Sequence, residues 1–85
     1  MKLYSVKINY ISNEDYVIPE LLLEFNIHGN NIEEARQKTL SNLRFHMLDE
    51  NDFYVVDQSS NYCEVSFGDA HTGQDVSYII TEVFT

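Results

Sequence analysis

The side chains of this sequence that are best suited to acid–base or metal chemistry include three histidines, His28, His46 and His71. None of them has a second histidine four residues away, the spacing that places two imidazoles on one face of a helix to hold zinc. A histidine at an isolated position is more often a surface or capping residue than a ligand or a general base. We therefore predict no metal site and no cofactor.

A second group with chemical capacity is the segment from Gly68 to Asp75, which contains Asp69, His71 and a second glycine. Acidic groups and glycines within a short span can wrap a cation. An EF-hand loop, however, needs a glycine at its sixth position and a bidentate glutamate at its twelfth, and this segment lacks that spacing. We interpret the segment as a polar loop between two strands.

The single cysteine, Cys63, is the remaining candidate nucleophile. It alternates with Val65 and Phe67, which indicates a buried position in a strand. A reactive thiolate needs a neighbouring cation, and no lysine or arginine follows Arg44. A lone cysteine forms no intrachain disulfide and gives no sign of an oxidising compartment. Since a Gly-x-Ser-x-Gly motif is also missing, we expect a protein that is not an enzyme and has no catalytic residue.

The remaining side chains with a possible functional role are the acidic ones, and they are unevenly distributed along the chain. The chain has a net charge of −9, of which residues 1–44 contribute only −1 because five cations there face six acids. Residues 45–85 carry eight acids and no lysine or arginine. We predict these acids as partner-binding groups: Asp49, Glu50, Asp52, Asp57, Glu64, Asp69, Asp75 and Glu82. Proteins bind nucleic acid through lysine and arginine that displace counterions, so direct binding of nucleic acid is disfavoured.

Apolar residues along the whole chain predict that one domain, residues 1–85, positions these acids. Hydrophobic residues make up 44% and aromatic residues 13% of the sequence, enough to bury a core, whereas two domains would each be too small. Alternating or apolar runs predict strands, and spacings of three and four predict a helix. The expected elements are strands at 2–11, 20–28, 53–57, 62–67 and 76–84, and a helix at 32–48.

This order is ββαβββ, and its many short connections favour antiparallel pairing. The sequence therefore predicts an α+β fold with a largely antiparallel sheet and a single helix packed on one face. The first two strands are expected to form a hairpin in which two apolar sets face the core. The sets are Tyr4, Val6, Ile8 and Tyr10 in the first strand and Leu21, Leu23, Phe25 and Ile27 in the second.

The predicted helix begins after Asn31, which has the spacing of a capping box with Glu34. One apolar stripe of the helix is expected to lie on the sheet. Phe45 falls on the opposite side of the helix beside Arg44, so we predict that it is an exposed aromatic anchor for a partner. The alternative is that the helix bends and buries the ring of Phe45. The residues of the stripe are Ile32, Ala35, Thr39, Leu40, Leu43 and Met47.

One helix covers only one face of a five-stranded sheet, so the other face must be solvated, self-associated or covered by a partner. The last predicted strand adds to this expectation because both of its alternating sets are largely apolar. A homodimer through this last strand, or through its face, is one interpretation. Packing of Ile79 and Val83 against a loop or the first hairpin is the other.

Acidity, small size and the lack of a catalytic motif favour a protein-binding function. An acidic surface can occupy the basic groove of a nucleic-acid-binding enzyme by electrostatic complementarity. In size and charge the chain is similar to the DNA-mimicking phage proteins that inhibit host restriction or CRISPR systems, the anti-restriction and anti-CRISPR proteins. That similarity of type implies an inhibitor with a basic protein as its partner. A homo-oligomeric assembly protein, and acidity that serves solubility alone, are the alternatives.

The sequence shows no pattern for export or membrane insertion. Residues 1–10 lack a basic stretch followed by an apolar run, and no apolar run approaches the roughly 20 residues that a transmembrane helix needs. We therefore expect a cytoplasmic protein that does not bind membranes, located in the host cytoplasm if a phage encodes it.

Overall fold

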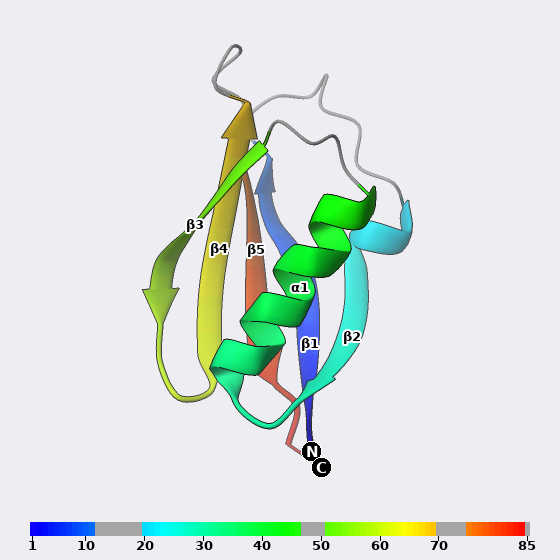
Figure 1. Cartoon of the computed structure of the whole chain (residues 1–85), viewed down its shortest axis with the longest axis vertical. Helices are drawn as coiled ribbons and strands as arrows, with labels where there is room; N and C mark the ends of the chain where they lie inside the picture. The colour runs from blue at the N-terminus through cyan, green and yellow to red at the C-terminus, as the bar shows by residue number, and fades with distance from the viewer. Residues whose placement is uncertain (12–19, 47–50, 70–74, 85) are drawn as a thin grey trace.

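The computed structural model describes residues 1–11, 20–46, 51–69 and 75–84, and Figure 1 shows their arrangement. No helix in these ranges combines the length and the apolarity that crossing a bilayer requires. The elements are β1 (Lys2–Ile11), the 3₁₀-helix η1 (Glu20–Leu22), β2 (Glu24–Gly29), α1 (Ile32–His46), β3 (Asn51–Gln58), β4 (Tyr62–Asp69) and β5 (Asp75–Glu82).

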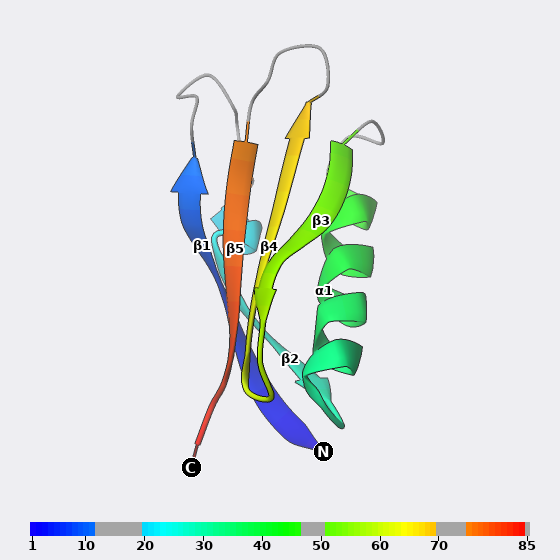
Figure 2. The same cartoon turned by 90° about the vertical axis from the view of Figure 1, so that its left-hand side faces the viewer.

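The strands form one antiparallel sheet in the order β2-β1-β5-β4-β3. α1 packs on one face of this sheet, where its main contacts are with β2, β5 and β4 (Figure 2). The predicted α+β fold, with one helix on one face of an antiparallel sheet, is confirmed. Strands from the first half of the chain, β1 and β2, lie together, and strands from the second half, β5, β4 and β3, lie together beside them (Figure 1).

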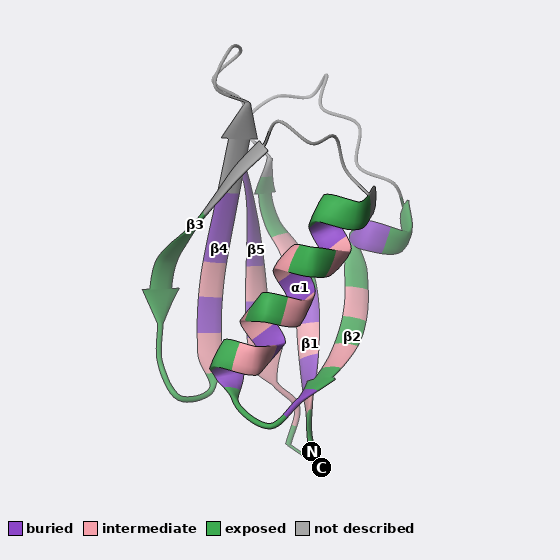
Figure 3. Cartoon of the chain, viewed as in Figure 1, coloured by how far each residue is buried: buried purple, intermediate pink, exposed green. Residues whose placement is uncertain are grey.

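The core lies between α1 and the sheet, where alternate strand residues meet one stripe of the helix (Figure 3). The predicted helical stripe is confirmed at four buried positions, while Met47 lies outside the described residues. The buried residues of the helix are Ile32, Ala35, Thr39 and Leu43. Those of the strands that face it are Tyr4, Val6, Cys63, Val65, Val76, Tyr78 and Ile80.

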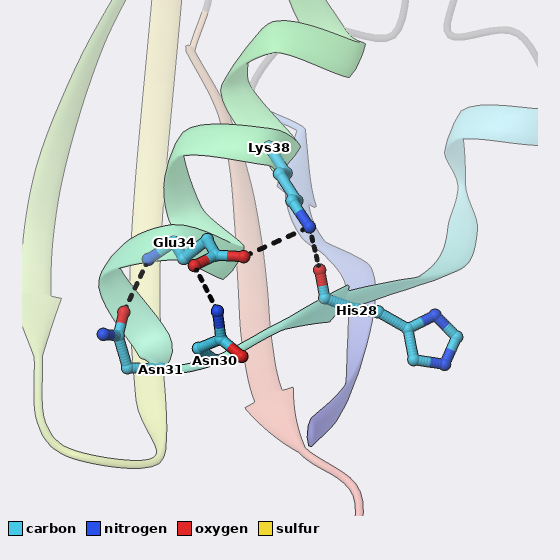
Figure 4. A network of polar contacts seen from close by, with 5 residues as sticks. All are labelled: His28, Asn30, Asn31, Glu34 and Lys38. Atoms are coloured by element: carbon cyan, nitrogen blue, oxygen red, sulfur yellow. Dashed lines mark hydrogen bonds and ion pairs between the residues drawn. The ribbon is translucent and has the colours of Figure 1, made fainter. Parts of the chain in front are cut away.

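Side chains cap the first turn of α1, as Figure 4 shows. Asn31 Oδ1 accepts a hydrogen bond of 2.9 Å from the Glu34 amide, which is the first half of the predicted capping box. The Glu34 carboxylate contacts Asn30 Nδ2 at 3.1 Å and Lys38 Nζ at 3.2 Å. Lys38 also donates to the His28 carbonyl at 2.8 Å, so the helix is tied to the end of β2.

Gly29 is the last residue of β2, and its lack of a side chain allows the helix to approach closely. A Cβ at this position would stand 3.1 Å from the Ala35 amide nitrogen and 3.4 Å from the Asn31 carbonyl oxygen. The first of these distances is shorter than an ordinary non-bonded contact. The end of β2 and the first turn of α1 therefore meet through their backbones.

The second predicted strand begins later than the sequence indicated. Residues 20–22 form η1, in which the Leu23 amide donates to the Glu20 carbonyl at 3.1 Å. This turn buries Leu22 and leaves Leu21 and Leu23 exposed, so the prediction that the latter two face the core is wrong. The part of the predicted set that does pack against the core is Phe25 and Ile27.

A tertiary contact explains why the chain turns at this point. Tyr78, 56 residues further along the chain, donates a hydrogen bond of 2.7 Å from its hydroxyl to the Leu22 carbonyl. Both side chains are fully buried, and a buried hydroxyl needs such a partner. The turn that presents this carbonyl also inserts Leu22 into the core.

A β-bulge in β1 moves Tyr10 to the face of the sheet away from α1, called the open face here. The pairing of β1 with β5 shifts so that Ile8 lies opposite Tyr78 but Tyr10 lies opposite Ser77. Residues that stand directly opposite each other share a face. Tyr10 is therefore exposed on the open face, whereas the sequence predicted it beside Ile8 in the core.

The last strand, β5, lies in the middle of the sheet. It pairs with β1 on one side and with β4 on the other. Both of its backbone edges are used within the chain, so a homodimer cannot form by strand pairing through β5. A dimer through the open face stays a prediction. On that face Ile79 is half-buried between Lys7 of β1 and Glu64 of β4.

Candidate functional site

One row of residues that crosses the whole sheet carries four charged side chains on the open face. From β2 to β3 the register aligns Glu24, Lys7, Ile79, Glu64 and Asp57. Lys7 Nζ lies 3.6 Å from Glu24 Oε1, so this cation is paired toward β2. Ile79 separates Lys7 from Glu64, and Glu64 stands directly opposite Asp57. The row therefore ends, at β3, in two adjacent acidic residues, Asp57 and Glu64, called the acidic pair.

Two neighbouring hydroxyl groups contact the Glu64 carboxylate. Ser77 Oγ donates to Glu64 Oε2 at 2.8 Å, and the Tyr62 hydroxyl lies 3.5 Å from Glu64 Oε1. Burial raises the pKa of Tyr62, and the negative charges of Glu64 and Asp57 raise this pKa further. The Tyr62 hydroxyl therefore stays protonated at neutral pH and can donate. The contacts hold the Glu64 carboxylate in a defined position before any ligand arrives.

The two acids of the acidic pair stand opposite each other, which destabilises the sheet. Like charges directly opposite each other destabilise strand pairing by several tenths of a kcal/mol to about 1 kcal/mol. No lysine or arginine occurs in β3, β4 or β5 to offset this repulsion. Negative charge that is gathered on an accessible surface attracts cationic groups. The acidic pair is therefore suited to binding a cation supplied from outside the chain.

The structure pairs Lys2, Lys7, Arg36 and Lys38 with acidic side chains of the chain itself. Only one of these pairs reaches the second half of the chain. This pair involves Glu82. Because its carboxylate is paired and only 12% of its side chain is exposed, Glu82 does not contribute to the predicted acidic surface. The pairs are Lys2 with Glu82 at 3.2 Å, Lys7 with Glu24 at 3.6 Å, Arg36 with Glu33 at 3.7 Å and Lys38 with Glu34 at 3.2 Å.

The eight acids predicted from the sequence are described to different extents. Those with described side chains are Asp57, Glu64 and Glu82, of which the first two form the acidic pair. Those described by their backbone alone are Asp52, Asp69 and Asp75. Those outside the described residues are Asp49 and Glu50.

Strand register brings three of the predicted acids to one end of the sheet. Asn51 lies opposite Asp69, and the next row across the strands is Asp52, Gly68 and Asp75. Asp52, Asp69 and Asp75 thus occupy neighbouring positions at the ends of β3, β4 and β5. This end and the acidic pair belong to the same three strands.

Phe45 is exposed, as predicted, with 84% of its surface open to solvent. It lies near the end of α1, and α1 covers the face of the sheet opposite the acidic pair. The structure therefore does not bring Phe45 together with Asp57 and Glu64. A single partner would have to reach around the sheet to contact both places.

The residues considered for catalysis or metal binding do not gather into a site within the described ranges. No three His, Cys, Asp or Glu residues come together there as metal ligands. His28 is exposed at the end of β2, and His71 lies outside the described residues. Cys63 is fully buried, as predicted, and burial raises the pKa of its thiol, which opposes formation of a reactive thiolate.

A shallow hollow of about 360 Å³ lies at the end of the sheet where β1 begins and β5 ends. The ion pair of Lys2 and Glu82 lies in its lining. The remaining lining residues are Met1, Leu3, His28, Val83 and Phe84.

The solvent exposure of the apolar side chains of β3 was not predicted from the sequence. Tyr54, Val55 and Val56 are 52%, 42% and 52% exposed, although they are consecutive apolar residues of one strand. In the sequence, the only feature that marks this strand is a continuous apolar run from Phe53 to Val56 between two aspartates. Such a run is typical of a strand that is buried on both faces, and only the strand order shows that β3 lies at an edge.

Comparisons of the chain with protein-family models, with curated proteins and with solved structures found no match.

Proposed function

We propose that the chain is a non-enzymatic protein-binding domain that occupies a basic surface of a partner protein. The observation that carries this proposal is the separation of charge across the sheet. β5, β4 and β3 lie side by side and contain no lysine or arginine. Asp52, Asp57, Glu64, Asp69 and Asp75 therefore lie on adjacent strands, as does Glu82, which is paired with Lys2.

The acidic pair gives the proposed binding surface its centre. Glu64 is held by Ser77 and Tyr62, and a group that is already ordered loses less conformational entropy when it binds. Tyr54, in the neighbouring row of the open face, adds an exposed ring that can stack on a cation. Arginine and lysine side chains of a partner complement this combination of carboxylates and aromatic rings.

Basic protein surfaces commonly bind nucleic acid, because lysine and arginine neutralise phosphates. A folded chain with a cation-free acidic side can compete for such a surface by imitating the charge of the backbone. The specific form of the proposal is therefore an inhibitor that acts by DNA mimicry, in the manner of anti-restriction and anti-CRISPR proteins of phages.

Partner capture followed by competition tests the proposed function. The tagged full chain isolates binding proteins, mass spectrometry identifies them, and association with the purified partner is then measured at rising salt concentration. We expect the association rate to fall steeply with salt, and an excess of DNA duplex to displace the chain. Binding that is insensitive to salt, or a partner that holds DNA and the chain at the same time, contradicts the proposal.

Matched variants separate the acidic pair from net charge. The double variant Asp57→Asn, Glu64→Gln and the control Glu20→Gln, Glu33→Gln each remove two negative charges. We expect the first to weaken partner binding by about tenfold, which corresponds to about 1.4 kcal/mol, and the control to change it by less than about twofold. Equal losses in both would mean that net charge alone attracts the partner.

A further inference from the structure

β3 forms the edge of the acidic side of the sheet, and its outer edge is long. It has eight residues and pairs with β4 alone among the described strands. An unpaired strand edge presents amide and carbonyl groups that can accept another strand. The ladder with β4 is regular from Asn51 to Val55 and shifts between Val55 and Asp57. The regular part is a continuous template for a further strand.

The side chains of this edge lack the usual protection. Tyr54, Val55 and Val56 are all exposed, and Figure 3 shows this part of β3 in the colour of exposed residues. Val55 lies opposite the buried Val65 on the helix side, but the main contacts of α1 are with β2, β5 and β4. Natural edges are blunted by charged side chains, above all lysine, and by proline, a bulge or a covering element. β3 contains neither lysine nor proline; its only charged residues are Asp52 and Asp57, and its bulge begins only after Val55.

The strand that pairs with β3 could come from a second copy of this chain or from a different protein. Charge distinguishes these two cases. Each copy of the chain has a net charge of −9, and β3 itself contains Asp52 and Asp57 without a cation. A second copy would bring the same acids to the same edge, where like charges repel at close range. A segment with lysine or arginine would instead meet opposite charges at Asp57 and Glu64.

We propose that β3 takes up an extended cationic segment of the partner protein as a sixth strand of the sheet. This inference rests on the proposed function and adds the place and the form of binding. Alternate side chains of a strand point to opposite faces. Those of the incoming segment on the open face meet the ring of Tyr54 and the acidic pair, which suits arginine or lysine. Those on the helix side meet Val55, which suits an apolar residue.

A synthetic peptide of alternating arginine and valine is the probe for this inference. It is added to the isotope-labelled full chain, and NMR measures the chemical shifts and hydrogen-exchange rates of the backbone amides. We expect saturable binding and exchange about tenfold slower at the amides of β3. Binding that shifts α1 or β2 while the β3 amides exchange at an unchanged rate overturns the inference.

Two control peptides separate strand addition from charge attraction. A version with alternate backbone nitrogens methylated keeps its charges but cannot form the edge hydrogen bonds. We expect it to bind at least about tenfold more weakly and to leave β3 unprotected. Equal binding of the methylated peptide overturns strand addition and leaves the proposed function standing. Binding of an alternating glutamate and valine peptide also overturns the inference, because the occupant would then not be selected by charge.

Sedimentation of the free chain tests the other occupant, a second copy. We expect a monomer whose β3 amides exchange rapidly without the peptide. A dimer in which these amides are already protected, and which the arginine peptide does not displace, would assign the edge to a second copy and overturn the inference.

A pair of lysine variants locates the binding edge by mutation. Val55→Lys places a cation at the edge, and Leu21→Lys places one at an exposed position on η1, beyond the opposite side of the sheet. We expect the first to weaken binding of the arginine peptide by about tenfold and the second to weaken it by less than about twofold. Circular dichroism and urea unfolding check that both variants fold. Equal weakening by both variants contradicts binding at β3.

Discussion

The two edge strands of the sheet, β2 and β3, differ in the properties that decide whether an edge stays closed. β2 has six residues, and its ends are tied to the rest of the chain: Glu24 pairs with Lys7, and the His28 carbonyl accepts from Lys38 of the helix. β3 has eight residues, carries no cation, and exposes consecutive apolar side chains. β2 thus has a paired acid and a carbonyl bonded to the helix, whereas β3 exposes an acid and apolar side chains.

Substitutions at the two edges are therefore expected to have different effects. Contacts at β2 join strand, helix and core, so substitutions there should change the free energy of unfolding. The exposed side chains of β3 make few contacts with other described residues. Substitutions there should therefore change binding and leave the free energy of unfolding nearly unchanged, or even raise it.

The largest expected effect is at Leu22, which precedes β2 and is fully buried. Leu22→Ala should lower the free energy of unfolding by about 3 kcal/mol, because it removes core contacts beside the hydrogen bond from Tyr78. Urea denaturation measures this loss. The neighbouring Leu21→Ala, at an exposed position, should change stability by less than about 0.5 kcal/mol. Similar losses at both positions would contradict the structure of η1.

A smaller effect is expected at the helix cap that adjoins β2. Asn31→Ala should cost about 1 kcal/mol, because the Glu34 amide loses the acceptor that it has at 2.9 Å. Asn31→Asp keeps an acceptor at this position and should restore most of the loss. Thermal unfolding followed by circular dichroism compares the two variants, and equal melting temperatures would show that the cap does not contribute.

Charge reversal should act with opposite signs at the two edges. Asp57→Lys replaces a like-charged neighbour of Glu64 by an opposite charge and should raise the free energy of unfolding by about 0.5 kcal/mol. Glu24→Lys places a cation opposite Lys7 and should lower it by a similar amount, about 0.5 kcal/mol. Urea denaturation at low salt measures both. Stabilisation by neither variant would mean that the acidic pair carries no repulsion.

The smallest effect concerns acidification at the helix start. Hydrogen bonding from Lys38 lowers the pKa of Glu34 below its ordinary value of 4.5. The carboxylate therefore stabilises the fold above pH 4.5, and this contribution is lost as the pH falls through the lowered pKa. Glu34→Gln should be slightly less stable than the natural chain near neutral pH and equal to it in strong acid. Lys38→Gln should abolish most of this pH dependence, and an unchanged dependence in that variant would show that another group causes it.

Much of the fold could be predicted from the sequence because its signals are local. Alternation in β1, the spacing of the helical stripe and the cap at Asn31 each arise within a few residues. Leu22 and Tyr10 could not be placed correctly for the opposite reason. Leu22 is positioned by Tyr78, and Tyr10 is moved by a bulge that depends on pairing with β5.

The candidate site, like the fold, has features that the local sequence indicates and features that only tertiary structure determines. The sequence shows eight acids and no lysine or arginine after Arg44, but only the strand order shows that Asp52, Asp57, Glu64, Asp69 and Asp75 lie on adjacent strands. The ion pair of Glu82 with Lys2 joins the two ends of the described chain and has no local signal. The exposure of Val55 and Val56 likewise depends on β3 lying at an edge, which composition cannot show.

The central place of β5 has a consequence for the way this protein reaches its native state. β1 with β2, and β3 with β4, can each pair as neighbours along the chain, but neither pair touches the other through a ladder until β5 enters between them. Closing the sheet requires contacts across most of the sequence, as between Leu22 and Tyr78, and such non-local closure slows folding. β5 follows β4 along the chain and pairs with it, so the ladder between β1 and β5, which joins the two halves of the sheet, should be the slow step of folding.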